Sequence, residues 1–360
     1  MHSRTSCARG SAARLLALVA ASAAALAGAA APAQGCDPCA IYLTSEARED
    51  QVGFRVGLAQ QFTYFHTLKV DGETVPNPDN ERIASSITQL MAGYEFLPRL
   101  SVQANLPIIS RSYRRIEATE VKSGDASGLG DMSLLLIGKP FSWSDIARIA
   151  HLALFAGLEL PTGGTSFLKE EVPAPPCVPF PDPNACAQRV RVALPPDVRP
   201  HHDGGPPSGI HGHDLTLGSG SVDGLLGTQL FGAWDRWFAT ASLQYAIRGS
   251  GAYDYRFAND LMYAGGPGAY LLAGDLLWGA PYSLRLQLLL SGESKGTDSI
   301  DGQSVGDTGI TTLNLGPVIG FAWGLHLATE LGAELPVLQS NTQLQIVPDY
   351  RLRGGLTWRF

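Results

Sequence analysis

The sequence predicts an all-β fold, a transmembrane antiparallel β-barrel of about 12 strands with short periplasmic turns and long extracellular loops. Three observations lead to this prediction. Apolar and polar residues alternate along many segments, the connections between these segments alternate between short and long, and no apolar run after residue 33 reaches the length of a spanning helix. Because backbone groups inside a bilayer must be hydrogen-bonded within helices or within a closed sheet, a barrel is the architecture that remains.

Twelve segments show the alternation of a strand, in which successive side chains point to opposite faces. An even number of strands is the rule in bacterial barrels. The twelve segments are residues 52–66, 83–96, 99–110, 130–139, 147–160, 221–233, 236–248, 262–278, 281–291, 310–321, 324–335 and 346–360.

The connections between these segments alternate in length, which a β-sandwich or a propeller has no reason to do. Short turns on one side and long loops on the other are typical of bacterial barrels, so the first strand is expected to leave the periplasm and the last to return to it. The short connections are residues 97–98, 141–146, 234–235, 279–280 and 322–323, and the long polar ones are residues 67–82, 111–129, 161–220, 249–261, 292–309 and 336–345.

The last strand places apolar and aromatic residues on one face and Arg351, Arg353 and Arg359 on the other. An edge strand of a soluble β-domain shows the same alternation, and the loop pattern favours the barrel. In a barrel these arginines face the lumen. Resemblance to outer-membrane proteins in general implies that the terminal Phe360 is available to the barrel-assembly machinery.

The N-terminus predicts export. Three arginines precede an Ala/Leu-rich run that ends in Ala31-Pro32-Ala33, so residues 1–33 are expected to form a cleaved signal peptide, with a retained anchor or a lipoprotein signal at Cys36 as weaker alternatives. Residues 34–51 then form a periplasmic segment, and residues 52–360 form the barrel. Loss of three arginines and of no acidic residue takes the formal net charge from -7 to -10, which gives no reason to expect a nucleic-acid partner.

Four cysteines of the mature chain fall into two close pairs. Cys36 and Cys39 form a CxxC in the periplasmic segment, and Cys177 and Cys186 lie in the long loop 161–220. In an oxidising compartment we expect a local disulfide in each pair. For the CxxC the alternatives are a redox or metal-ligand pair, lipid attachment, and docking of a periplasmic partner.

The same long loop carries four histidines, His201, His202, His211 and His213, each pair followed by an aspartate. Imidazoles in such a cluster bind copper, zinc or nickel, and His211 and His213 share a face if the segment is extended. The preferred interpretation is a polar loop whose histidines and aspartates cap turns. No cofactor is therefore expected, with a transition metal in this loop as the alternative.

The inward positions of the strands predict a lumen of mixed charge. Gly-x-Ser-x-Gly occurs at residues 292–296 and 302–306, but both lie in the predicted loop 292–309 and not in an elbow between a strand and a helix. No metalloprotease helix or phosphate-binding loop occurs either, so the chain is not expected to be an enzyme. The predicted pore-lining residues are Arg55, Asp131, His151, Glu159, Arg248, Arg285, Glu330, Glu334, Arg351 and Arg353.

Three Gly-rich segments carry a resemblance to a known family. They are Ser127-Gly128-Leu129-Gly130-Asp131, Gly157-Leu158-Glu159-Leu160-Pro161-Thr162-Gly163 and Leu217-Gly218-Ser219-Gly220-Ser221. As an ordered set they resemble the outer-membrane barrels grouped with the MetA-pathway phenol-degradation proteins, described as putative transporters. The resemblance implies a cell outer-membrane location and passage of small, often aromatic or apolar, compounds.

Three hypotheses follow. The first is a barrel, surrounded by outer-membrane lipid, that passes or binds a small solute, with selectivity set by pore width and lining charge. The second is an outer-membrane scaffold that binds a metal or a periplasmic redox partner through the CxxC segment and the His-rich loop. The third, the least favoured, is an outer-membrane hydrolase.

Overall fold

The computed structural model describes residues 52–117, 120–145, 147–172, 208–277 and 280–360. The described residues do not include the expected signal peptide, the CxxC segment, Cys177, Cys186, His201 or His202. What the sequence indicates for them stays a prediction.

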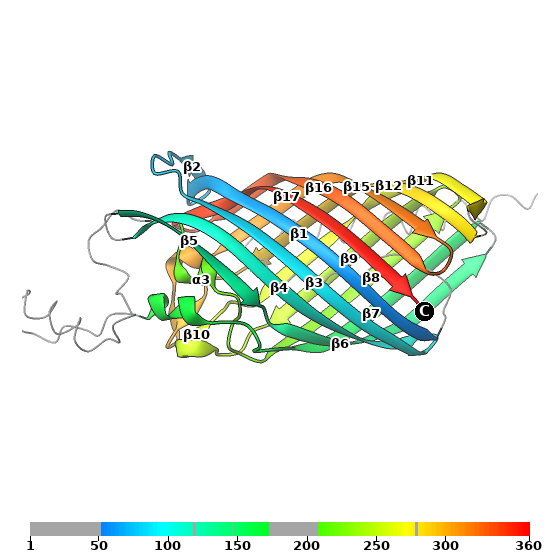
Figure 1. The fold of residues 1–360 in the computed structure, drawn as a ribbon, viewed down its shortest axis with the longest axis horizontal. Helices are drawn as coiled ribbons and strands as arrows, with labels where there is room; N and C mark the ends of the chain where they lie inside the picture. Colours follow the sequence, from blue (N-terminus) through cyan, green and yellow to red (C-terminus); the bar gives the residue numbers. More distant parts are fainter. Residues whose placement is uncertain (1–51, 118–119, 146, 173–207, 278–279) are drawn as a thin grey trace, which may run out of the picture.

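Twelve long antiparallel strands close into one barrel (Figure 1). The first and last strands, drawn blue and red, lie side by side and pair from Arg55↔Arg359 to Val70↔Leu344. The strands are β1 (Gly53–Val70), β3 (Arg82–Leu97), β4 (Leu100–Glu117), β6 (Met132–Asp145), β7 (Arg148–Leu160), β8 (Asp223–Trp234), β9 (Trp237–Ile247), β11 (Asp260–Leu277), β12 (Ala280–Lys295), β15 (Ile310–Trp323), β16 (Leu327–Asn341) and β17 (Leu344–Arg359).

The twelve predicted strands are confirmed, and several run further than predicted. The largest difference concerns residues 111–129, predicted as a loop, in which β4 continues to Glu117 and pairs with β5 (Glu120–Leu129). Residues 120–129 are mainly small and polar, so the apolar alternation that marks the other strands is missing there. Below this hairpin β4 pairs with β6 instead, and the backbone passes from β5 to β6 at Gly130 and Asp131.

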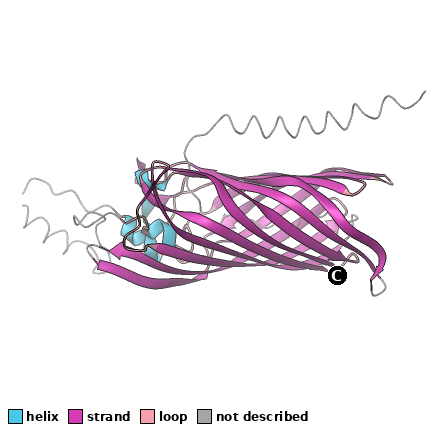
Figure 2. Ribbon diagram, turned by 90° about the horizontal axis from the view of Figure 1, so that it is seen from above, coloured by secondary structure: helices cyan, strands magenta, loops and turns pink. Residues whose placement is uncertain are grey.

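The two ends of the barrel differ. The end that carries Phe360 has short connections between strands and is called the turn end (Figure 1). The opposite end, called the loop end, gathers the helical segments, as Figure 2 shows. Its short elements are β2 (Glu73–Val75), η2 (Ser166–Glu171), α3 (Gly212–Leu215), η3 (Ala252–Asp254), β10 (Tyr255–Arg256), β13 (Ser299–Ile300), β14 (Gln303–Ser304) and η4 (Gly306–Thr308). Within the described residues, no helix is long and apolar enough to cross a membrane.

The outer surface is apolar and the lumen is largely polar. Leu286, Leu288 and Leu290 on β12 are exposed, whereas Arg285 and Gln287 between them are buried inside. The same alternation repeats on β16, where Leu331 and Leu335 are exposed and Glu334 is buried. A soluble protein places its apolar face inward, so this reversed arrangement fits a barrel whose surroundings are lipid.

The outward position of Leu288 gives a testable expectation. Leu288 lies halfway along β12 and is exposed on the outer surface. Leu288→Arg is therefore expected to lower the free energy of unfolding from phospholipid bilayers by about 2–4 kcal/mol, because the arginine must enter hydrocarbon. Equilibrium urea unfolding from vesicles measures this loss. The matched control is Gln303→Arg in the exposed β14, which should change the free energy by less than about 0.5 kcal/mol. Equal effects of the two substitutions would contradict a lipid-facing Leu288.

Candidate functional site in the lumen

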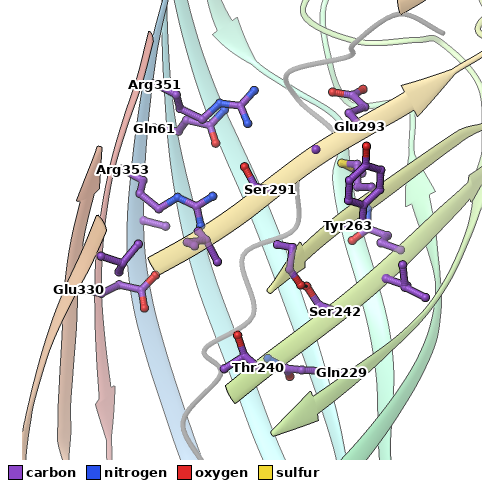
Figure 3. A pocket seen from close by; sticks show the side chains of 18 of the residues that line it. Gln61, Gln229, Thr240, Ser242, Tyr263, Ser291, Glu293, Glu330, Arg351 and Arg353 are labelled. Atoms are coloured by element: carbon purple, nitrogen blue, oxygen red, sulfur yellow. The ribbon is translucent and has the colours of Figure 1, made fainter. Parts of the chain in front are cut away.

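A cavity of about 190 Å3 lies inside the barrel, between the turn end and the loop end. Figure 3 shows Arg351, Arg353 and Glu330 on one side of it and Tyr263, Ser242 and Gln229 on the other. Its side chains come from β1, β3, β7, β8, β9, β11, β12, β15, β16 and β17, so nearly the whole circumference of the barrel contributes. The charged and polar residues of the lining are Gln60, Gln61, Gln89, Gln229, Thr240, Ser242, Gln244, Tyr263, Gln287, Ser291, Glu293, Glu330, Arg351 and Arg353.

One side of the cavity is charged and held by ion pairs. The Nε of Arg353 lies 2.6 Å from Oε1 of Glu334, and Glu334 also accepts a hydrogen bond from Ser291. Arg285 lies 3.4 Å from Glu330 on the next strand but one. Because Arg353 and Arg285 are each paired with a carboxylate of another strand, they keep fixed positions and a solute meets a preformed polar surface.

Part of the lumen wall away from these arginines is apolar. Leu135, Ile137, Phe155, Leu225 and Ala246 form a buried cluster on the inner faces of β6, β7, β8 and β9. Phe155 belongs both to this cluster and to the cavity lining, so the cavity borders the apolar wall directly. The lumen therefore offers a solute both an apolar surface and a charged one.

The apolar wall is missing from the predicted pore lining. The predicted lining contains only charged residues and His151, whereas residues 134–137 read Leu-Leu-Leu-Ile without alternation. An unbroken apolar run marks a strand that is apolar on both faces. Glu293 was missed for a different reason: the predicted strand 281–291 ended before it, although it continues the inward alternation of Arg285 and Gln287.

Toward the turn end, an ion cluster and an aromatic layer run along the inner wall. Glu95 lies within 3.5 Å of Arg55, within 3.9 Å of Lys139 and within 3.2 Å of Arg359. The aromatic layer is a chain of neighbouring rings: His151 stacks on Phe231 at 5.3 Å between centroids, Phe231 on Phe238 at 6.1 Å, and Phe238 meets Tyr270 at 5.3 Å. The predicted lumen residues Arg55 and His151 thus lie below the cavity.

Toward the loop end, the predicted lumen residues hold structure together. Arg248 lies 3.2 Å from Glu159, 2.8 Å from Asp223 and 2.7 Å from Asp260, and all four side chains are buried. The Asp131 carboxylate accepts hydrogen bonds from the backbone N of Gly163 at 2.8 Å and from the backbone N and Oγ of Ser219 at 2.7 and 2.9 Å.

Residues 208–222, called the plug, fold against the inner wall at the loop end. Ile210, Leu215 and Leu217 pack on buried residues of β1, β3, β4 and β17. The buried Arg111 donates to the carbonyl oxygens of Asp214 at 2.6 Å and Thr216 at 2.7 Å. Glu81, which is 1% exposed, accepts from Oγ of Ser208 at 2.5 Å and the backbone N of Gly209 at 2.9 Å. The plug therefore occupies part of the barrel mouth.

Two of the four predicted metal-binding histidines come together in the plug. The rings of His211 and His213 stack at 5.5 Å, close to the carboxylates of Glu171, Asp214 and Asp307. Burial lowers the pKa of His211 below its ordinary value. Burial also acts to lower the pKa of His213, but the surrounding carboxylates outweigh it and raise that pKa to about 10. A cationic group is thus favoured at His213.

A closed twelve-stranded barrel with an apolar exterior and a polar cavity defines the class of outer-membrane β-barrels. The chain is similar in structure to the COG4313 outer membrane channel from Pseudomonas putida F1, with a TM-score of 0.54 at 15% sequence identity, over 89% of this chain and 100% of that chain. This likeness concerns the fold alone.

Two further solved structures are less similar to this chain. The CymD monoaromatic hydrocarbon channel matches with a TM-score of 0.34 at 7% identity, over 86% of this chain and 89% of that one. LpxR from Salmonella typhimurium matches with a TM-score of 0.34 at 10% identity, over 85% of this chain and 100% of that one. No protein-family model matches the sequence, and no curated protein matches it either. The resemblance to the MetA-pathway phenol-degradation family stays a prediction.

Proposed function

We propose that the protein is an outer-membrane channel that passes or binds a small solute with an aromatic or apolar part and a polar or anionic group. The likeness in fold to an outer membrane channel and the apolar outer surface support the location. The sequence supports it further through the predicted signal peptide. In this proposal the turn end is periplasmic, the loop end is extracellular, and the exposed C-terminal Phe360 is the residue offered to the barrel-assembly machinery.

The observation that carries the proposal is the two-sided lumen. Phe155, a member of the apolar cluster on β6 to β9, lines the cavity together with Arg351 and Arg353, which come from β17 in a distant part of the barrel wall. An apolar cavity of about 150 Å3 is large enough to hold benzene, so a cavity of about 190 Å3 admits one aromatic ring. A ring that carries a carboxylate or hydroxyl satisfies both sides at once, which neither a sugar nor a plain alkane does.

The test compares solutes of this kind with others in proteoliposomes that contain the purified barrel. Benzoate is expected to cross faster than glucose, relative to protein-free vesicles. Arg351→Gln is expected to lower the preference for benzoate over benzyl alcohol by about 3- to 10-fold, because it removes a cation from the cavity. Tracer uptake over time measures both rates.

The matched control is Arg114→Gln, which removes one arginine from β4 near the loop end and away from the cavity lining. It should leave the preference unchanged. Equal permeation of benzoate and glucose, or a preference that Arg351→Gln does not alter, would contradict the proposed solute class. No uptake above protein-free vesicles for any of the three compounds would contradict the channel itself.

A further inference from the structure

Five ionisable side chains from three separate loop segments meet at the loop end. Glu171 ends η2, His211, His213 and Asp214 belong to α3 and its N-terminal flank, and Asp307 lies in η4 between β12 and β15. The side chains of Glu171 and His213 are 3% and 4% exposed, so the centre of the group is closed to bulk water. We call this group the histidine–carboxylate cluster.

We propose that the histidine–carboxylate cluster binds one divalent transition-metal ion of the zinc class, with His211, His213 and Asp214 as its ligands. This binding site does not depend on which solute the lumen takes. Neutral imidazole and carboxylate are the ligand types found together in such sites, and three protein ligands leave one position for water or a fourth side chain.

The spacing of the ligand atoms fits a site that is nearly formed. One ligand atom each of His211, His213 and Asp214 lies within 4.8 Å of the others. Bonds of about 2.0 Å at tetrahedral angles place two ligands about 3.3 Å apart, so a closing movement of roughly 1.5 Å is needed. Side-chain rotation covers that distance without a change in the backbone.

Glu171 orients one of the ligands. Its Oε1 lies 3.0 Å from Nδ1 of His213 and also accepts a hydrogen bond from the backbone N of His213 at 2.8 Å. A carboxylate bound to one ring nitrogen fixes the tautomer and leaves the other nitrogen to the metal, which is the usual carboxylate–histidine–metal arrangement. Glu171 is therefore a positioning residue rather than a ligand.

The other nitrogen of His213 is the observation that points to a ligand. Its Nε2 is buried and has no hydrogen-bond partner among the described residues, and Oδ1 of Asp214 lies 3.6 Å away. A buried polar atom without a hydrogen bond is costly, and a metal ion between Nε2 and Oδ1 would remove that cost.

Asp214 is fixed in the same way. Its Oδ2 accepts a hydrogen bond from the backbone N of His211 at 2.8 Å, which leaves Oδ1 directed at His213. Asp307 lies 3.4 Å from Nδ1 of His211 and can supply the fourth position. The side chains of Asp214 and Asp307 are 25% and 22% exposed, so an ion can enter from the solvent at the loop end.

The alternative occupant of the cluster is a proton. The carboxylates that favour a protonated His213 also favour a divalent cation in the same place, and the two compete because a metal ligand must be deprotonated. With a metal bound, α3 in the plug would be joined to the loop between β12 and β15 when Asp307 completes the site. Metal would thus strengthen the attachment of the plug to the barrel mouth.

The test uses the full-length folded protein in detergent, stripped with EDTA and then titrated with zinc chloride by calorimetry. One zinc per chain with micromolar or tighter affinity is expected. His211→Ala and Asp214→Asn are each expected to weaken zinc binding by at least about 100-fold, and Glu171→Gln by about 10- to 100-fold. Cobalt in place of zinc should give the intense visible absorption of a tetrahedral site, and His211→Ala should abolish it.

The matched controls remove imidazoles elsewhere. One control is His66→Ala, which removes an imidazole of β1 that is hydrogen-bonded to Asn80. The other replaces both His201 and His202 by alanine. Each variant should still bind one zinc ion per chain with the wild-type affinity. Heat-modifiable gel mobility shows that every variant is folded, and Asp214→Asn keeps the shape of the side chain if His211→Ala does not fold. A folded wild-type chain that binds no zinc, or zinc binding that survives both His211→Ala and Asp214→Asn, would overturn the proposal.

Discussion

Arg248→Leu is expected to destabilise the barrel by about 3–5 kcal/mol. Arg248 is buried among the carboxylates of Glu159, Asp223 and Asp260, which come from three different strands. Removal of one member of a buried ion cluster costs much more than the cluster contributes, because the remaining charges keep their desolvation penalty without a partner. Equilibrium unfolding in urea, followed by tryptophan fluorescence, measures the loss.

A control and a rescue separate this effect from a general loss of arginine. Arg148→Leu removes an exposed arginine that lies over the ring of Trp234 and should cost less than about 1 kcal/mol. In the Arg248→Leu background, Asp260→Asn is expected to restore part of the lost stability, because it removes one of the buried carboxylates that lost its cation. If Arg248→Leu were no more harmful than Arg148→Leu, the ion cluster would not support the barrel.

The alternation of residues was enough to predict the twelve strands. Apolar outward positions such as those of β12 and β16 repeat with period two, and lipid on the outside leaves few exceptions. Where the alternation weakens, the prediction weakens as well. The sequence of β5 lacks the alternation and therefore predicts a loop. β5 pairs only with the outer part of β4 and leaves the barrel wall, so its side chains do not have to be apolar to face lipid.

The roles of the inward residues could not be predicted in the same way. Arg248 was expected to line a pore, and alternation correctly gives an inward position, but its three carboxylate partners lie 25, 12 and 89 residues away along the chain. Which inward residues meet depends on the strand register and on where the loops fold back. Neither the register nor the path of the plug is encoded in a local pattern.

The plug shows this most clearly. Arg111 and Glu81 were not candidates, because nothing near them in the sequence marks them as partners of residues 208–216. The pairing exists because β4 continues beyond the predicted strand 99–110 and places Arg111 at the mouth, where the carbonyl oxygens of Asp214 and Thr216, at the end of α3, need donors. A loop that is long and rich in Gly and Pro is thus held by buried charges on the barrel wall.

Asp131→Ala is expected to open the barrel mouth about 100-fold more often without unfolding the barrel. Asp131 accepts three hydrogen bonds, one from Gly163 and two from Ser219, and these join both ends of the long loop to the start of β6. Hydrogen bonds to a charged group contribute about 1.5–3 kcal/mol each, so a net loss of about 3 kcal/mol for the set is a conservative estimate. That loss raises the population of a detached plug by about two orders of magnitude. The strand ladder does not pass through the Asp131 side chain and should stay intact.

Single-channel recording in planar bilayers tests this expectation. The wild type should show rare brief openings, and Asp131→Ala should show frequent ones of the same size, because the lumen beneath the plug is unchanged. The matched control is Asp125→Ala, which removes an exposed carboxylate from β5, six residues away, and should behave as the wild type. Openings that are equally rare in all three proteins would mean that the plug does not limit passage. The constriction would then have to lie deeper, at the aromatic layer formed by His151, Phe231, Phe238 and Tyr270.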